Sequence, residues 1–195
     1  MEGIGDINII VPIYMKNGMP MTPVAEILDK AIFGADISKF KFCGNEVTYN
    51  NDRYTLCEPV DTIDNQVFVS VDFYLRIFNN LVSITGTKIK LHDSFDPPYL
   101  TEKSSLFIKK GEYFSIEVLN SIKKSMTIPP EIGLMGESPI VLSALRKVWV
   151  IEPDGMGGQN RYEKDTYGPP KTIMSFKSKE TGRYMIDNFT IIVVD

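Results

Sequence analysis

The alternation of apolar and polar positions predicts β-strands along most of this chain. The clearest case is residues 67–78, where every second position from Val67 to Ile77 is apolar. A strand sends alternate side chains to opposite faces, so this segment is expected to have one buried face and one that is partly wet. Asn79-Asn80 follows, and Asn tolerates the positive φ that a two-residue turn requires. The pattern therefore predicts a long hairpin over residues 67–91.

The return strand of this hairpin, residues 81–91, contains one irregular position. In a strict two-residue register, Lys88 and Lys90 face the apolar side of the first strand. A bulge at Gly86-Thr87 shifts the count by one and places Ile89 and Leu91 there instead. We therefore expect a β-bulge at Gly86-Thr87.

A second hairpin is expected over residues 39–58, with its turn near Tyr49-Asn50-Asn51. A three-residue loop there places Cys43 directly across from Cys57. Cross-strand Cβ atoms lie about 4.5–5.5 Å apart, slightly wider than in most disulfides. Two reduced thiols in a cytosolic protein are the expected state, and a bridge between them is the alternative.

One helix is expected, at about residues 23–33. Thr22 is a suitable N-cap, Pro23 suits the first helical position, and Gly34 is a suitable C-terminal stop. A short helix is marginal by itself in water, so its apolar stripe is expected to dock on the sheet or on an oligomer partner. The stripe has helical spacing and consists of Val24, Ile27, Leu28, Ala31 and Ile32.

The remaining strands are expected at residues 105–109, 112–119, 146–152, 171–177 and 183–194. Hairpin turns are expected at Lys109-Lys110-Gly111 and Glu180-Thr181-Gly182. These elements predict an all-β protein, an antiparallel β-sandwich or jelly-roll-like fold with the one N-terminal helix. A single domain is expected over residues 1–195, with a strand–helix segment at 1–35. Long loops are expected at 92–105, 123–139 and 153–170.

Composition fits an ordinary soluble domain. The chain has 195 residues, is 43% hydrophobic and has a formal net charge of −4. An acidic balance, with a pI near 5.2, argues against a nucleic-acid binder. No apolar run is long enough to cross a bilayer, and no positively charged segment precedes the first apolar residues. The expected location is the cytoplasm, without membrane or nucleic-acid partners.

Catalytic and cofactor motifs are weak. His92, the one histidine, is followed by Asp93 and Ser94, but neighbouring residues on an extended chain cannot form a hydrolase triad with one another. A surface-loop histidine is the expected state. The glycines at 155, 157 and 158 are not followed by the Lys-Ser/Thr pair or the helix that a phosphate-binding loop needs. We therefore expect no enzyme activity, no cofactor and no metal site.

Aromatic residues in polar segments are the better candidates for function. Phe95 and Tyr99 flank Pro97-Pro98, whereas Tyr162 and Tyr167 lie in the long stretch at 153–170. Aromatic residues are enriched at contact surfaces, although they also fold back on their own domain. The four side chains are therefore interface candidates.

These features favour a non-catalytic structural or assembly protein, a β-sandwich subunit that binds copies of itself or other structural proteins. A virion component, such as a phage capsid, neck or tail protein, fits that description and extends the location to the virion. The alternative is a ligand-binding β-sandwich, such as a carbohydrate-binding module, with Trp149 or the loop tyrosines as the stacking platform. Trp149 lies in an apolar strand and is expected in the core.

Overall fold

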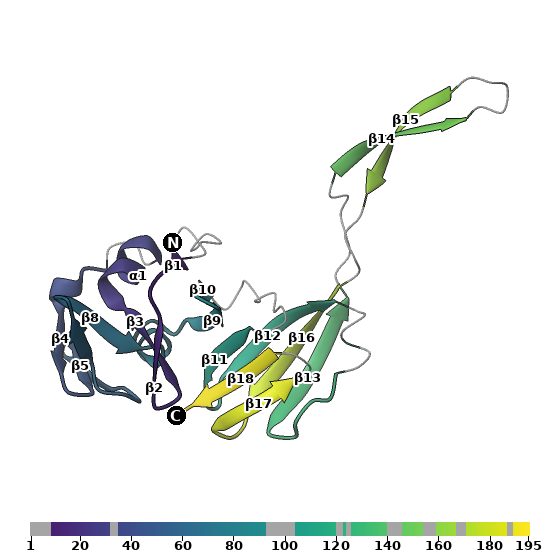
Figure 1. Cartoon of the computed structure of the whole chain (residues 1–195). Helices are drawn as coiled ribbons and strands as arrows, with labels where there is room; N and C mark the ends of the chain where they lie inside the picture. The colour runs from purple at the N-terminus through teal and green to yellow at the C-terminus, as the bar shows by residue number, and fades with distance from the viewer. Residues whose placement is uncertain are drawn as a thin grey trace.

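The computed structural model describes residues 9–31, 35–92, 104–119, 123, 126–139, 146–153, 159–166, 171–186 and 189–195. The described part of the chain consists mainly of β-strands in several sheets, with two α-helices (Figure 1). The expectation of an all-β, sandwich-like protein is confirmed.

The largest sheet has six strands in the order β1-β10-β9-β11-β18-β17. All its pairs are antiparallel except the parallel pair of β11 and β18, which the sequence did not suggest. In chain order the strands are β1 (Ile9–Ile10), β9 (Leu81–Thr85), β10 (Lys88–His92), β11 (Ser105–Lys109), β17 (Gly182–Ile186) and β18 (Phe189–Val194).

Strands β11 and β18, which are neighbours in the interior of this sheet, separate two hydrophobic cores. Leu106 and Ile108 of β11 belong to one core, while Phe107 between them belongs to the other. In β18, Ile191 and Val194 divide in the same way. Successive side chains of a strand point to opposite faces, so both faces of these strands are covered, as continuous apolar runs require. The single strand expected at residues 183–194 is wrong, because this segment forms two strands, β17 and β18, that pair antiparallel with Ile186 opposite Phe189.

A three-stranded sheet, ordered β12-β16-β13, contributes to the second core. Its strands are β12 (Tyr113–Leu119), β13 (Ile132–Pro139) and β16 (Lys171–Ser178), and both pairings are antiparallel. The register of β13 against β16 shifts between Leu134 and Gly136, which marks a bulge. Phe114 and Phe176 stack at 5.3 Å between ring centroids in the core. This sheet and the β11–β18 region form the sandwich.

The first core is completed by the N-terminal half of the chain. A four-stranded sheet has the order β2-β3-β8-β7, and a three-stranded meander has the order β4-β5-β6. The strands are β2 (Tyr14–Lys16), β3 (Met19–Pro23), β4 (Phe40–Cys43), β5 (Glu46–Tyr49), β6 (Asp52–Thr55), β7 (Asp61–Ile63) and β8 (Gln66–Ser70). The helical elements are α1 (Val24–Ala31), α2 (Asp72–Phe78) and a short 3-10 turn, η1 (Ile37–Lys39).

The N-terminal helix is confirmed at α1, with Val24, Ile27, Leu28 and Ala31 buried as the spacing predicts. The helix begins one residue later than expected, because Thr22 and Pro23 belong to β3 and pair with β8. Thr22 is fully buried, and its hydroxyl lies 3.2 Å from the Tyr74 hydroxyl. The residues from 32 to 34, including the expected stop at Gly34, lie outside the described residues.

The long hairpin predicted over 67–91 is wrong, because residues 72–78 form helix α2 instead of a strand. The carboxylate of Asp72 and the guanidinium of Arg76 pair at i,i+4 spacing, which a helix allows and a strand does not. Asn79 ends the helix in the left-handed conformation with φ 56°. The asparagine therefore serves as a helix C-terminus rather than as a hairpin turn.

The predicted bulge at Gly86-Thr87 is also wrong. Strands β9 and β10 pair with Thr85 opposite Lys88, which leaves Gly86-Thr87 as a two-residue turn. Gly86 adopts φ 61°, the positive value that such a turn needs. The expected bulge depended on a single strand over residues 67–78 that turns at Asn79-Asn80. Residues 72–78 form helix α2 instead, so no register mismatch arises.

Residues 40–55 form a three-stranded meander rather than one hairpin. A turn at Gly44-Asn45 pairs Cys43 with Glu46, so Cys43 does not face Cys57. Both cysteines are free thiols. The turn expected near Asn50-Asn51 is present, and both of its residues have positive φ.

Two further hairpins differ from expectation. The turns at 109–111 and 180–182 lead from one sheet to another, since β11 and β17 belong to the six-stranded sheet and β12 and β16 to the sheet opposite. The loop expected at 123–139 contains strand β13, and the loop expected at 153–170 contains β15 (Gln159–Thr166). Most of the loop expected at 92–105 lies outside the described residues.

Candidate functional site

A two-stranded arm is the most unusual feature of the described chain. It consists of β14 (Arg146–Pro153) and β15, which pair antiparallel over eight residues each. Figure 1 shows this ribbon standing away from the other sheets. We refer to these two strands as the arm and to the other described elements as the body.

The arm is inserted between two neighbouring strands of the sandwich. It follows β13 and precedes β16, and these strands pair with Pro139 opposite Thr172. The chain therefore leaves the body and returns to it at adjacent points of one sheet. Removal of the insertion can in principle close β13 and β16 into an ordinary hairpin, because their ends already lie side by side.

Within the described residues, no third strand pairs with either strand of the arm. A single two-stranded hairpin is at best marginally stable in water, and three strands or a packed face are needed for independent stability. The β14 sequence contains the apolar run Val148–Ile151, whereas β15 is polar. Arg161, Tyr162 and Glu163 of β15 are exposed, and Tyr162 retains 40% exposure. A partner that covers the ribbon would supply the missing support.

Tyr162 is the one predicted interface residue that the structure describes, and it lies on a projecting strand rather than in a loop. The other three candidates, Phe95, Tyr99 and Tyr167, lie outside the described residues.

A pocket of about 390 Å³ lies beside the outer strand of the sandwich, β12. Tyr113, Phe114 and Ser115 of β12 line one side of it. Residues at the C-terminus of α2 and the start of β9 line the other side. Of these, Leu75 and Leu81 are apolar, whereas Asn79 and Asn80 are polar. The remaining lining residues are Lys109, Glu112, Ser175 and Phe176. This volume is at the lower end for ligand pockets.

Sequence reasoning missed this pocket, because its lining comes from separate segments of the chain. Two of the lining groups lie at places that the sequence marked as turns, Asn79-Asn80 and Lys109-Lys110-Gly111. The turn signals were visible, but their proximity depends on the antiparallel pairing of β9 with β11 and on the unexpected helix α2.

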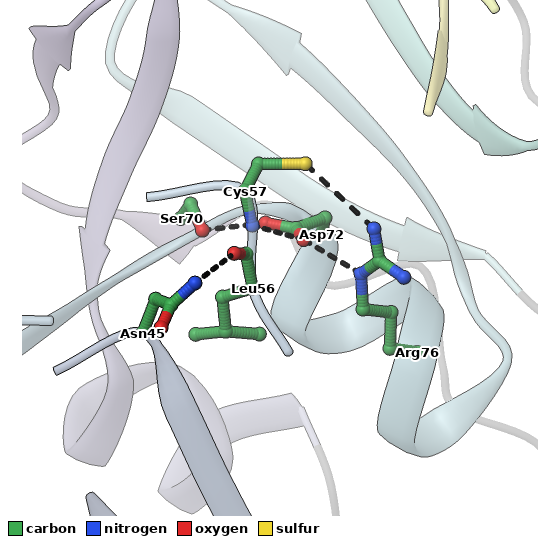
Figure 2. A network of polar contacts seen from close by, with 6 residues as sticks. All are labelled: Asn45, Leu56, Cys57, Ser70, Asp72 and Arg76. Carbon is green, nitrogen blue, oxygen red and sulfur yellow. Dashed lines mark hydrogen bonds and ion pairs between the residues drawn. The ribbon is translucent and has the colours of Figure 1, made fainter. Parts of the chain in front are cut away.

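A second polar site surrounds the buried carboxylate of Asp72 (Figure 2). Asp72 has no exposed surface and accepts hydrogen bonds from the Ser70 hydroxyl at 2.5 Å and from the Cys57 backbone N–H at 2.8 Å. The Arg76 Nε donates to it at 2.8 Å. The carboxylate thus joins β8, α2 and the segment after β6 through charge-assisted hydrogen bonds.

The thiol in this network is unsuited to nucleophilic chemistry. Desolvation and the negative charge of Asp72 raise the pKa of the Cys57 thiol to about 11, although Arg76 donates to its sulfur at 3.8 Å. The thiolate is the reactive form, and a raised pKa keeps it scarce at neutral pH.

His92 is buried, contrary to the expectation of a surface-loop histidine. It lies on β10 with 2% exposure, and its Nε2 is 2.7 Å from the Ser83 hydroxyl. The Asn80 side chain donates to its carbonyl oxygen at 3.2 Å. A serine and a histidine at this distance resemble part of a hydrolase site, but a ring enclosed to this degree offers no surface for a substrate.

The described residues hold neither a candidate metal site nor a helix that could cross a membrane. No cluster of three or more His, Cys, Asp or Glu side chains capable of holding a metal occurs among them. None of the helices there has the length and apolar character that a membrane crossing requires. No protein-family model, no curated protein and no solved structure matches this chain.

Proposed function

We propose that this chain is a non-catalytic structural subunit that assembles with copies of itself or with other structural proteins. The observation that carries the proposal is the arm, a two-stranded ribbon that stands away from a well-packed body (Figure 1). An element of this kind is stable when a partner covers it or extends its sheet. A subunit of a virus particle, as the sequence suggested, is one assembly of this kind.

Two further observations support this proposal. Tyr162 is exposed on the arm, and tyrosine is among the residues most enriched at the centres of protein interfaces. Asp72 and His92, which each anchor a polar network, are themselves buried, and their hydrogen bonds stabilise the fold. The chemistry of the described residues is therefore better suited to holding a shape than to a reaction.

Replacement of the arm tests the proposal. Residues 140–171 are replaced by Asn-Gly, so that Pro139 and Thr172 are joined by a two-residue hairpin turn. We expect this arm-replaced chain to unfold in a cooperative transition like the full chain, because both cores lie outside the arm. We expect its assembly to be lost, as measured by sedimentation velocity.

The control for this experiment is the full chain carrying Ile10→Lys, which changes a 64%-exposed apolar residue on β1 and leaves the arm intact. Its assembly should match that of the wild type. An arm-replaced chain that assembles as well as the wild type would refute the proposed role of the arm.

The second candidate function is ligand binding, and the pocket beside β12 is the observation that favours it. Tyr113 and Asn79 supply an aromatic ring and an amide there, groups that sugar sites commonly combine. The arm-replaced chain distinguishes the two functions. Saturable binding of oligosaccharides by that chain, measured by calorimetry, would support the ligand-binding module.

A further inference from the structure

We propose that the pocket and the free edge of β12 together accept the arm of a second copy of this chain, with Tyr162 as the side chain that enters the pocket. This inference rests on the proposed function and names the partner and the contact surface. It is drawn from three observations: the unpaired edge of β12, the position and lining of the pocket, and the exposed tyrosine on the arm.

Strand β12 is an edge strand of its sheet in the described part of the chain, with β16 as its one neighbour. The Ser178 N–H donates to the Glu112 carbonyl across this pair. In an antiparallel ladder, residues alternate between those bonded to the neighbouring strand and those whose N–H and C=O groups point away. The backbone groups of Tyr113, Ser115 and Glu117 are therefore directed to the open side.

An open edge of seven residues is a template for another strand. Proteins that use such an edge obtain affinity from main-chain hydrogen bonds and specificity from pockets that take alternate side chains of the added strand. Both features occur together here, since Tyr113 and Ser115 belong to the edge and also line the pocket. An extended strand laid along β12 would bring a side chain to the pocket.

The lining of the pocket fits an aromatic ring that carries a polar tip. Leu75, Leu81, Phe114 and Phe176 supply apolar surface, while Asn79, Asn80, Ser115 and Ser175 supply hydrogen-bonding groups. A tyrosine side chain combines an apolar ring with a hydroxyl that needs a partner when it is buried. Tyr162 is such a side chain, 40% exposed and carried on an extended strand of a projecting ribbon.

The arm suits the edge for a second reason. A two-stranded ribbon has open edges of its own, and pairing with β12 and β16 would give it the additional strands that an isolated hairpin lacks. The same contact would therefore give the arm additional strands and give the edge of β12 a strand to pair with. Because the arm and the edge lie on different parts of one chain, the contact joins copies either head to tail, as a heterologous interface, or by reciprocal exchange about a two-fold axis.

Ser115→Pro tests the edge. Proline removes the N–H of residue 115, which points away from β16, so the hydrogen bonds within the sheet are kept. Ser115→Ala is the matched control, because it also loses the 2.9 Å contact between the Ser115 and Ser175 hydroxyls but keeps the N–H. Both variants lose the side chain that lines the pocket, so the difference between them isolates the backbone N–H. We expect self-association to be at least about tenfold weaker for Ser115→Pro than for Ser115→Ala.

Complementation of two variants tests the pairing itself. The Ser115→Pro chain has an arm and a blocked edge, whereas the arm-replaced chain has an open edge and no arm. Neither should self-associate, but an equimolar mixture should form a one-to-one complex in sedimentation velocity. Tyr162→Ala added to the Ser115→Pro chain should weaken that complex by at least about tenfold.

Several results would overturn this inference and leave the proposed function standing. One is that the Ser115→Pro chain assembles as well as the wild type, while assembly of the wild type still depends on its arm. Another is a mixture in which no complex forms. A third is a monomeric wild type whose unfolding temperature falls in Ser115→Pro but not in Ser115→Ala, which would show that the chain itself covers the edge. Assembly that does not depend on the arm would instead overturn the proposed function.

Discussion

Asp72→Ala is expected to lower the free energy of unfolding by about 3–5 kcal/mol, the usual range when one partner of a buried ion pair is removed. Asp72 has no exposed surface, and its carboxylate accepts from Ser70, Cys57 and Arg76. The substitution leaves these donors without an acceptor inside the protein, and unmet buried donors are costly. Urea unfolding followed by far-UV circular dichroism measures the loss.

The matched control is Asp61→Ala. Asp61 also accepts from a cation and a hydroxyl, Lys16 at 2.7 Å and Tyr14 at 2.6 Å, but its side chain is 33% exposed. Water can replace these contacts, so the loss should be about 1 kcal/mol or less. Equal losses for the two variants would contradict the view that Asp72 is a central structural link.

Phe73→Ala is expected to have a similar effect, a loss of about 3–5 kcal/mol through a cavity in the first core. Phe73 has no exposed surface. Its ring lies 5.1–6.3 Å, between centroids, from the aromatic rings of Phe40, Phe42, Tyr74 and Phe78. The same urea titration applies, because circular dichroism reports the whole body.

The control for Phe73 is Phe42→Ala, which removes the same side chain from the same aromatic cluster. Phe42 is half-buried, so less apolar surface leaves water when the protein folds, and the loss should be clearly smaller. If Phe42→Ala proved the more destabilising of the two, the placement of Phe73 at the centre of the cluster would be wrong.

Both large effects fall on helix α2, the element that the sequence pattern misrepresented. The apolar residues from Val67 to Ile77 alternate with period two, yet the strand ends at Ser70. Alternation of apolar and polar residues indicates a strand with one solvent-exposed face. Here Asp72, Phe73, Tyr74 and Leu75 are all buried, so these residues have no solvent-exposed face that would favour a strand. Tertiary burial therefore decided between helix and strand.

A local signal for this helix was present. Asp72 and Arg76 have the i,i+4 spacing of a helical ion pair, and Asn79 is a common residue after a helix C-terminus. The spacing of the ion pair fits a helix and not a strand. The Asn79-Asn80 pair was ambiguous, since asparagine with positive φ serves helix ends and hairpin turns equally.

The strands at 105–109, 113–119, 171–178 and 189–194 could be predicted because their apolar positions, alternating in two of them and continuous in the other two, match their burial. Their pairing could not. Short connections suggested hairpins, but each one crosses between layers, and the parallel contact of β11 with β18 joins residues far apart in the chain. Sequence periodicity reports which face is buried, not which strand lies next to it.

Strand β15 of the arm could not be predicted for a related reason. Strand β15 reads Gln-Asn-Arg-Tyr-Glu-Lys-Asp-Thr, and an exposed strand has no buried face to leave an apolar pattern. Its polar composition resembled a loop. Tyr162 was nevertheless singled out, because an aromatic residue within a polar stretch is unusual whatever the backbone does. The pocket beside β12 had no comparable signal in any one segment.

Hydrogen exchange of the arm is the most direct measurement of whether this ribbon depends on a partner. In dilute, monomeric protein, the amides of β14 and β15 should exchange close to the unprotected rate, while those of the central strand β18 stay protected. At concentrations where copies associate, the arm amides should become protected and those of β18 should not change. If the arm amides were as protected as those of β18 in the monomer, the account would be contradicted, because the ribbon would then be stable without a partner.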